Sequence, residues 1–220
     1  MGPEQAGGGP GAWPLDPASL AARVRGRLAG RGRRVVEPGD RTAAAVLVLF
    51  VYRAGEPHLV FAKRTETVPH HRGQVAFPGG VVREADGSPV ATALREAAEE
   101  VGLDPRTVEV LGLFDDSPTH ATPFVITPVL GLCREAPTFH PDGRETERVL
   151  EVPLRHLLEP ATFHEEWWER EGRPHRVGFF RCGEDVVWGA TARILRELLD
   201  ALFPESRARA AGAAGPGAPP

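Results

Sequence analysis

Three glutamates lie close together in the segment from Phe77 to Leu103. Glu96, Glu99 and Glu100 follow one another at the spacing i, i+3, i+4, which places three carboxylates on one face of a helix. Two of them occupy the last turn, where the helix dipole favours cations over anions. Oxygen ligands held together in this way suit Mg²⁺ or Mn²⁺, whose charge would remove the repulsion. The spacing therefore predicts a divalent-metal site, and the alternative is a solvated acidic face.

The helix that must carry these side chains has its own start and stop signals. Ser88 can cap the N-terminus, Pro89 suits the first helical position, and Gly102 suits a left-handed residue at the C-terminus. The residues predicted to form the apolar face are Val90, Ala93, Leu94, Ala97 and Val101. The residues predicted to face away from it are Thr92, Arg95, Glu96, Glu99 and Glu100.

A glycine loop and an acid precede this helix. The loop is Pro78-Gly79-Gly80, the acid is Asp86, and the helix continues as Arg95-Glu96-Ala97-Ala98-Glu99-Glu100-Val101-Gly102-Leu103. This stretch resembles the Nudix box, G-x5-E-x7-R-E-U-x-E-E-x-G-U, in which U is aliphatic. The first half departs from the pattern, because Asp86 stands where Glu is usual and one extra residue separates it from Arg95. The resemblance implies a Nudix hydrolase, an α/β protein with an α/β/α sandwich around a mixed β-sheet.

Residues 59–80, LVFAKRTETVPHHRGQVAFPGG, resemble a further signature. The coenzyme A pyrophosphatase branch of the Nudix hydrolases carries L-L-T-x-R-S-x3-R-x3-G-x3-F-P-G-G. Arg64, Gly73 and the run from Phe77 to Gly80 match it, whereas Pro69 stands where the second arginine belongs. That arginine could grip a phosphate through two hydrogen bonds, and proline cannot.

Other positions could replace the missing arginine or extend the resemblance to the coenzyme A pyrophosphatases. His70 and Arg72 lie close to Pro69 and are candidates to replace the missing arginine, although an ordinary polar loop is the equal alternative. The run Trp188-Gly189-Ala190-Thr191-Ala192 also appears in coenzyme A pyrophosphatases, so the resemblance covers roughly residues 41–203.

The resemblance implies roles for individual residues. Glu96 and Glu100 are expected as the principal metal ligands, Glu99 joins them directly or through water, and the Gly80 carbonyl contributes. Arg95 is expected to orient a glutamate, and the general base is expected to be Glu145, with Glu99 as the second choice. The residues expected to bind substrate are Arg64, Arg72 and His70.

The activity that the resemblance implies is metal-dependent hydrolysis of a nucleotide pyrophosphate. Coenzyme A or an acyl derivative would give adenosine 3′,5′-bisphosphate and a 4′-phosphopantetheine product. The second candidate is a Nudix diphosphatase for ADP-ribose, NADH or dinucleotide polyphosphates, which Pro69 favours. A candidate of another class is an inactive Nudix-fold module that binds a nucleotide. The intact Arg95-Glu96…Glu99-Glu100 pattern opposes it, since a binding module has no need of three repelling carboxylates.

Composition bounds the remaining choices. The chain has 220 residues, 41% of them hydrophobic, which is enough for one domain with a substantial core. A net charge of −4 gives no reason to expect nucleic acid as a partner. Cys133 and Cys182 form no recognisable disulfide or zinc pattern, and no apolar run reaches the length of a membrane span. We expect a cytoplasmic enzyme with a small-molecule nucleotide substrate and no membrane partner, and a homodimer is left open.

The domain boundaries follow composition. We expect a flexible segment over residues 1–40 that contains one helix starting at Asp16 or Ser19, a Nudix domain over 41–203, and a disordered tail over 204–220. The basic residues Arg31 to Arg34 are predicted to form a solvated arm.

Regular elements are predicted throughout the middle of the chain. Strands are expected over residues 43–52, 58–64, 108–114, 124–132 and 149–153, a short helix over 154–158, and a hairpin within 161–188. Trp167 and Trp168 are interpreted as half-buried aromatics of that hairpin. The last helix is predicted to bury an apolar stripe made of Ala192, Leu195, Leu199 and Leu202.

Overall fold

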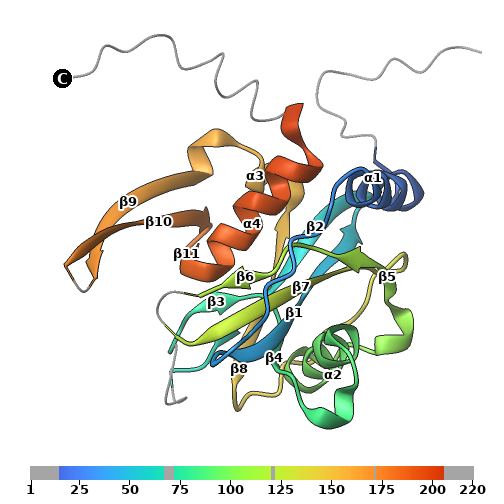
Figure 1. Ribbon diagram of the computed structural model, residues 1–220. Coiled ribbons are helices and arrows are strands. Elements are labelled where there is room, and N and C mark those ends of the chain that lie inside the picture. Colours follow the sequence, from blue (N-terminus) through green and yellow to red (C-terminus); the bar gives the residue numbers. More distant parts are fainter. Residues whose placement is uncertain (1–14, 67–71, 120–121, 171, 206–220) are drawn as a thin grey trace, which may run out of the picture.

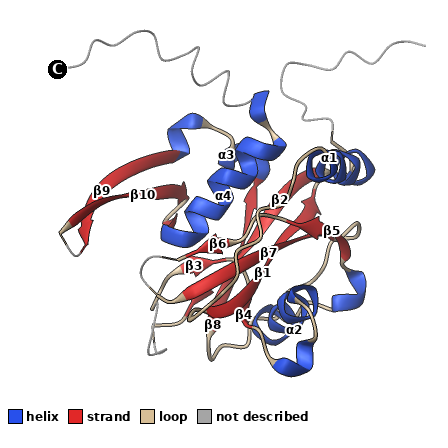
Figure 2. Cartoon of the chain, in the orientation of Figure 1, coloured by secondary structure: helices blue, strands red, loops and turns tan. Residues whose placement is uncertain are grey.

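The computed structural model describes residues 15–66, 72–119, 122–170 and 172–205 (Figure 1). The α-helices in these ranges are α1 (Pro17–Ala29), α2 (Pro89–Val101), α3 (Leu154–Leu157) and α4 (Gly189–Leu202). The strands are β1 (Thr42–Arg53), β2 (Glu56–Arg64), β3 (Val75–Ala76), β4 (Gly79–Val81), β5 (Glu109–Leu113), β6 (Ser117–Pro118), β7 (Phe124–Leu132), β8 (Thr146–Pro153), β9 (Phe163–Arg170), β10 (Arg173–Cys182) and β11 (Asp185–Trp188). Figure 2 shows how the helices and strands are distributed. Every strand and helix predicted from the sequence is present, with shifts of a few residues at the ends.

One mixed sheet organises the molecule. Its strand order is β5-β7-β1-β2-β3-β11-β10-β9, and β4, β6 and β8 pair with β1, β7 and β2 respectively. The long central pair β1 and β7 is parallel, with Thr42 opposite Phe124 and Phe50 opposite Leu132. The β1–β2 hairpin is antiparallel and places Arg53 opposite Glu56, so its two-residue turn is Ala54-Gly55.

The sheet is covered on both faces, which confirms the α/β/α sandwich. Alternate residues of β1 point to opposite faces. Val48 and Phe50 belong to the core that α1 and α4 cover, whereas Leu47 and Leu49 belong to the core under α2. Figure 1 shows α2 on the other side of the sheet from α1 and α4. Because both faces of β1 are buried, its sequence is a continuous apolar run rather than an alternating one.

Pro128 lies inside β7, a central strand between β5 and β1, although proline is ordinarily found at edge strands, strand starts and bulges. Its carbonyl oxygen accepts the Phe114 N–H at 2.9 Å, at the point where β5 has ended and β6 has not begun. The N–H that proline lacks would face the same gap, so no ladder hydrogen bond is lost there.

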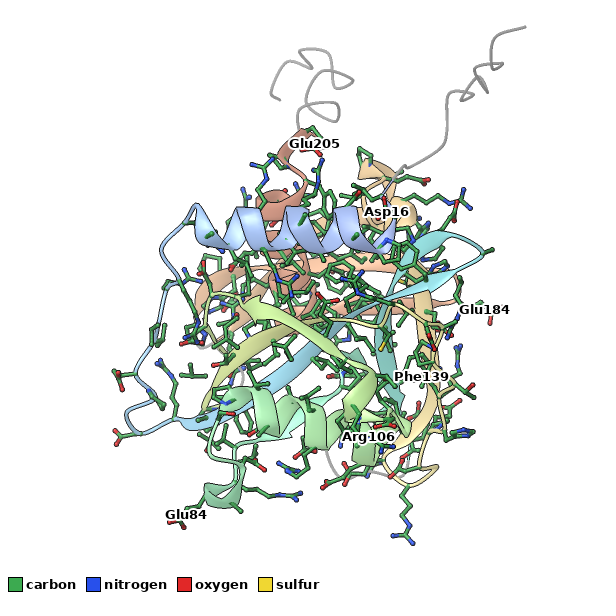
Figure 3. All side chains as sticks on the ribbon, turned by 90° about the vertical axis from the view of Figure 1, so that its right-hand side faces the viewer. Asp16, Glu84, Arg106, Phe139, Glu184 and Glu205 are labelled. Atoms are coloured by element: carbon green, nitrogen blue, oxygen red, sulfur yellow. The ribbon has the colours of Figure 1, made fainter. Side chains whose placement is uncertain are left out.

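The N-terminal helix and the arginines after it are part of the folded body. The Asp16 carboxylate caps α1 by accepting the Ala18 N–H at 2.8 Å, and Leu20 and Val24 are buried against α4 and the sheet. At the end of the last described segment, Glu205 accepts a hydrogen bond from Arg23 of α1; both Asp16 and Glu205 are labelled in Figure 3.

The prediction of a solvated arm at Arg31 to Arg34 was wrong. Arg33 donates to the Phe114 carbonyl at 2.9 Å and pairs with Asp116 at 2.5 Å, and Arg31 pairs with Asp115. Asp116 is buried, so this carboxylate needs charged partners, and the arginines supply them. These ion pairs join residues about eighty positions apart, so local sequence patterns do not predict them.

The interpretation of the hairpin tryptophans as half-buried is confirmed for Trp168, whose ring packs against those of Phe179 and Trp188, and is wrong for Trp167. Trp167 is 66% exposed and Trp168 is 44% exposed. Strands β9 and β10 project beyond the end of α4 (Figure 1), so the outer half of the hairpin lacks a covering layer. The predicted stripe of the last helix is confirmed, because Ala192, Leu195, Leu199 and Leu202 are all buried.

Candidate metal centre and active site

The helix α2 begins and ends where the sequence predicts. The Ser88 hydroxyl accepts the Ala91 N–H at 3.1 Å, and Gly102 takes the left-handed conformation with φ of 66°. The predicted outer face is wrong at two positions: Thr92 is fully buried and Glu100 is only 8% exposed. Thr92 donates a hydrogen bond to Asp86, which precedes the helix, and the Glu100 carboxylate lies against Gly79 of β4, so the buried stripe is wider than helical periodicity predicts.

Glu100 is a buried carboxylate held against the glycine loop. Its Oε2 accepts the Gly79 N–H at 3.1 Å, and its Oε1 lies 3.7 Å from a guanidinium nitrogen of Arg64. Burial, reinforced by the negative charges of Glu96 and Glu145, raises the pKa of Glu100 to about 7, although the Gly79 N–H and Arg64 oppose the shift. A nearby cation would stabilise the charged form of this buried carboxylate.

Glu96 lies on the second glycine of the same loop. A Cβ atom at Gly80 would be 2.6 Å from the Glu96 carboxyl carbon, a distance that no real contact reaches. The missing side chain of Gly80 therefore makes the room that the Glu96 carboxylate occupies. Strand β4 fixes Gly80 in place, opposite Ala45 of β1.

Two arginines hold the exposed side of the acidic cluster. Arg95 donates to Glu96 at 2.7 Å and to Glu99 at 3.2 Å. Arg83 binds Glu99 through two hydrogen bonds of 3.3 Å and lies 3.8 Å from Glu96. Arg83 was not predicted as a site residue from the sequence. Its only sequence signal is that it is a basic residue three positions after the glycine loop.

Asp86 orients Arg95 despite the irregular spacing. The Asp86 carboxylate accepts two hydrogen bonds from Arg95, at 2.7 and 2.9 Å, and one from the Thr92 hydroxyl at 2.8 Å. These bonds, led by those from Arg95 and joined by the Arg83 N–H, hold the pKa of Asp86 well below its usual range. A short 3₁₀ turn (Glu84–Asp86) ending in Gly87 accommodates the extra residue, so the departure from the motif leaves the pairing intact. Glu84 of this turn is labelled at the end of the molecule in Figure 3.

Glu145 comes to the site on an anchored loop. The Asp142 N–H donates to the Glu100 carbonyl at 3.2 Å, and the Asp142 carboxylate accepts the N–H groups of residues 144–146. The Glu145 carbonyl accepts the Thr65 N–H at 2.9 Å. The Glu145 side chain is 59% exposed and accepts a hydrogen bond of 3.1 Å from Arg64, which also faces Glu100. Hydrogen bonds therefore hold the Glu145 backbone, while its carboxylate is exposed.

The predicted site residues therefore separate into groups. The structure brings together Gly80, Arg64, Arg95, Glu96, Glu99, Glu100 and Glu145. Arg64, expected to bind substrate, is engaged by the two carboxylates Glu100 and Glu145. Arg72 is exposed beside the loop whose residues 67–71 are not described, and His70 lies outside the described residues.

The donor set fits a hard divalent cation. Glu96 and Glu100 are one helical turn apart, both largely buried, and both lie on the Gly79-Gly80 loop. Carboxylate and carbonyl oxygens are the ligands that Mg²⁺ and Mn²⁺ prefer. In the part of the chain that the structure describes, no three acidic, His or Cys side chains already converge on one point. Arg83 and Arg95 hold Glu96 and Glu99, so a cation would compete with these arginines for the carboxylates.

Comparison with known proteins agrees with this geometry. Residues 41–174 match the family model described as NUDIX domain. The chain therefore belongs to the Nudix hydrolases, and it is an enzyme of that family. Nudix hydrolases generally use divalent metal ions and nucleotide-containing substrates.

Individual relatives are similar over most of the chain. The uncharacterized Nudix hydrolase NudL of Cronobacter sakazakii is 43% identical over 159 residues, which cover 72% of this chain and 82% of that protein. The protein of the same name from an Enterobacter species is 40% identical over the same shares of both chains. Among solved structures, the NUDIX domain of Shewanella oneidensis NrtR complexed with ADP ribose is 21% identical and matches with a TM-score of 0.43, covering 60% of this chain and 84% of that one. No helix among the described residues is long and apolar enough to cross a bilayer.

Proposed function

We propose that this chain hydrolyses the pyrophosphate bond of coenzyme A or its acyl derivatives with the help of Mg²⁺ or Mn²⁺. Water adds across the bridge: one P–O bond forms, the bridging P–O bond breaks, and the products are adenosine 3′,5′-bisphosphate and (acyl-)4′-phosphopantetheine. The observation that carries the proposal is the position of Arg64. This residue of the coenzyme A-type segment lies within ion-pair distance of both Glu100, at 3.7 Å, and Glu145, at 3.1 Å.

The proposed roles follow from position and charge. Glu96 and Glu100, with Glu99 and the Gly80 carbonyl, would hold the cations, which supply neutralisation of the diphosphate and activation of water. Arg95, fixed by Asp86, positions Glu96 and Glu99. Arg64 is a positioning residue that orients Glu100 and Glu145 through its guanidinium group.

Glu145 is the proposed general base. Its carboxylate is exposed, its backbone is anchored, and its neighbour Arg64 connects it to Glu100. A base needs reach to the attacking water and a suitable pKa, and it need not hold the metal. Glu99, half-exposed and paired with Arg83 and Arg95, is the second candidate.

We expect Glu145→Gln to lower kcat about 10²-fold while leaving the apparent affinity for Mg²⁺ nearly unchanged. The measurement is a Mg²⁺ titration of the initial rate for wild type and variant. Glu147→Gln is the matched control, because Glu147 is an exposed acid two residues further along the chain. If Glu145→Gln is silent and Glu99→Gln reduces kcat, the base belongs to the helix.

Substrate choice is tested by the 3′-phosphate. Coenzyme A carries this dianion and dephospho-coenzyme A lacks it, and a guanidinium group can hold a phosphate through two hydrogen bonds. Arg72 is exposed to solvent in the same coenzyme A-type segment as Arg64, and it is the candidate to bind this phosphate. We expect kcat/KM to be roughly ten- to a hundred-fold lower for dephospho-coenzyme A. Arg72→Ala should shrink this preference, and Arg106→Ala, which changes an 89% exposed arginine after α2, should not.

The second candidate substrate class is ADP-ribose, NADH and dinucleotide polyphosphates. The observation that favours it is Pro69, which stands where the coenzyme A signature has an arginine. Chromatographic product analysis over coenzyme A, acyl derivatives, ADP-ribose and NADH compares the candidates directly. Equal kcat/KM for coenzyme A and its dephospho form would contradict the coenzyme A proposal and favour the general diphosphatase.

A further inference from the structure

Among the residues that the structure describes, strand β9 is the last in the strand order and has an unpaired edge. It pairs with β10 on one side, and the strand order stops there. The hairpin of β9 and β10 extends away from the helices (Figure 1), and every residue from His164 to Arg170 is exposed. A regular, exposed edge of this length is a template for pairing with another strand.

The register of the hairpin identifies the backbone groups that face this edge. Antiparallel partners alternate between pairs that exchange hydrogen bonds and pairs that do not. Pro174, which has no N–H, is opposite Glu169, so this pair is of the second kind and Glu169 directs its N–H and C=O outward. By the same alternation, Trp167 and Glu165 also present their backbone groups to the open edge.

An aromatic cluster lies next to the edge. The Trp168 ring lies 5.8 Å from the Phe179 ring and 5.6 Å from the Trp188 ring, and the His164 ring lies 5.1 Å from that of Phe179. Trp168 is nevertheless 44% exposed. The neighbouring Phe180 points to the opposite face and is buried in the core. The cluster therefore leaves an apolar surface that a strand added at the edge would cover.

Two charges flank Trp168 on the same face. Glu166 precedes it by two residues and Arg170 follows it by two. We propose that a second copy of this chain adds its own β9 antiparallel to this one, about a two-fold axis at Trp168. In this arrangement, Trp168 faces the partner subunit's Trp168, and Glu166 faces the partner subunit's Arg170, twice by symmetry. Trp167 and Glu169 exchange backbone hydrogen bonds across the axis.

Other symmetric registers of β9 bring like charges together. An axis at Glu166 or at Glu169 places that glutamate opposite itself, and an axis at Trp167 places Glu165 opposite the partner's Glu169. Like charges directly opposite each other destabilise a strand pair, whereas opposite charges stabilise it. Of these four axes, the one at Trp168 is the one that places opposite charges of β9 across from each other. It also stacks the two exposed indole rings. The inference does not rest on the proposed substrate.

Charge reversal tests the pairing. Sedimentation equilibrium of the full chain from 1 to 100 μM should show a dimer of twice 23.7 kDa. Glu166→Arg and Arg170→Glu alone each place like charges opposite one another twice and should weaken dimerisation roughly ten- to a hundred-fold. The double reversal restores both pairs in swapped order and should recover the dimer. Arg106→Glu, the same charge change on a distant exposed arginine, should have no effect.

Each result has a clear meaning. A dimer that the single reversals weaken and the double reversal restores supports the pairing, and the restored dimer shows that the singles failed through charge and not through misfolding. A wild-type chain that is monomeric up to 100 μM overturns it. A dimer insensitive to the single reversals, or one that the double reversal does not restore, also overturns it, because the contact would then lie elsewhere or in another register.

Discussion

Glu100→Gln is expected to keep the fold and to lower kcat by at least about 10²-fold under saturating Mg²⁺ or Mn²⁺. Glutamine can still accept the Gly79 N–H that Glu100 accepts at 3.1 Å, so the local packing is preserved. It lacks the negative charge that a divalent cation requires at this buried position. Steady-state kinetics with each metal measure the effect. Turnover close to wild type in both metals would remove Glu100 from the metal site.

The metal-free stability of the same variant provides an independent reading. Because the folded-state pKa of Glu100 is raised from 4.5 to about 7, the folded protein binds more protons than the unfolded chain between these values. Protonated Glu100 therefore contributes up to about 3 kcal/mol to the free energy of unfolding. This contribution is fully present below about pH 4.5 and is lost as the pH rises through about 7. In EDTA, the wild-type Tm should fall over this range, and Glu100→Gln should lose this part of the pH dependence. The variant should be no less stable than wild type at pH 7.5.

Gly79→Ala and Gly80→Ala are expected to fail for different reasons, although the two glycines are adjacent. A Cβ at Gly79 would lie 2.4 Å from the Ala45 carbonyl oxygen and 2.6 Å from the Val46 Cα, both in the backbone of β1. Neither atom can move without disturbing the sheet, so Gly79→Ala should lower the free energy of unfolding by about 2 kcal/mol or more.

A Cβ at Gly80 would instead meet the Glu96 carboxylate, the end of a flexible side chain. Glu96 can turn away, so Gly80→Ala should change the free energy of unfolding by no more than about 0.5 kcal/mol. The displaced carboxylate should cost roughly 10²-fold in activity, because small displacements of catalytic groups have effects of this size. Urea unfolding and kcat/KM, measured on both variants, separate the two effects. A fully active Gly80→Ala enzyme would show that Glu96 need not lie on this glycine.

Local signals were sufficient to predict the element that carries the site. Helix α2 starts where the Ser88 hydroxyl accepts the Ala91 N–H three residues later, and it ends at Gly102, which can adopt positive φ. Both signals involve only residues close together in the sequence. The spacing of Glu96, Glu99 and Glu100 follows from the same helix. The strands were predictable because β1 and β7 are buried on both faces and are therefore apolar throughout.

Only the tertiary structure decided which of these side chains are buried and what they contact. Helical periodicity placed Glu100 on the outer face, but β4 and the Asp142 loop cover it, and these come from other parts of the chain. Trp167 shares a face of β9 with Phe163, which packs against the core, and it is exposed because the hairpin extends past α4. The burial of Glu100, which raises its pKa, is produced by segments that are distant in the sequence. A local sequence pattern therefore cannot predict it.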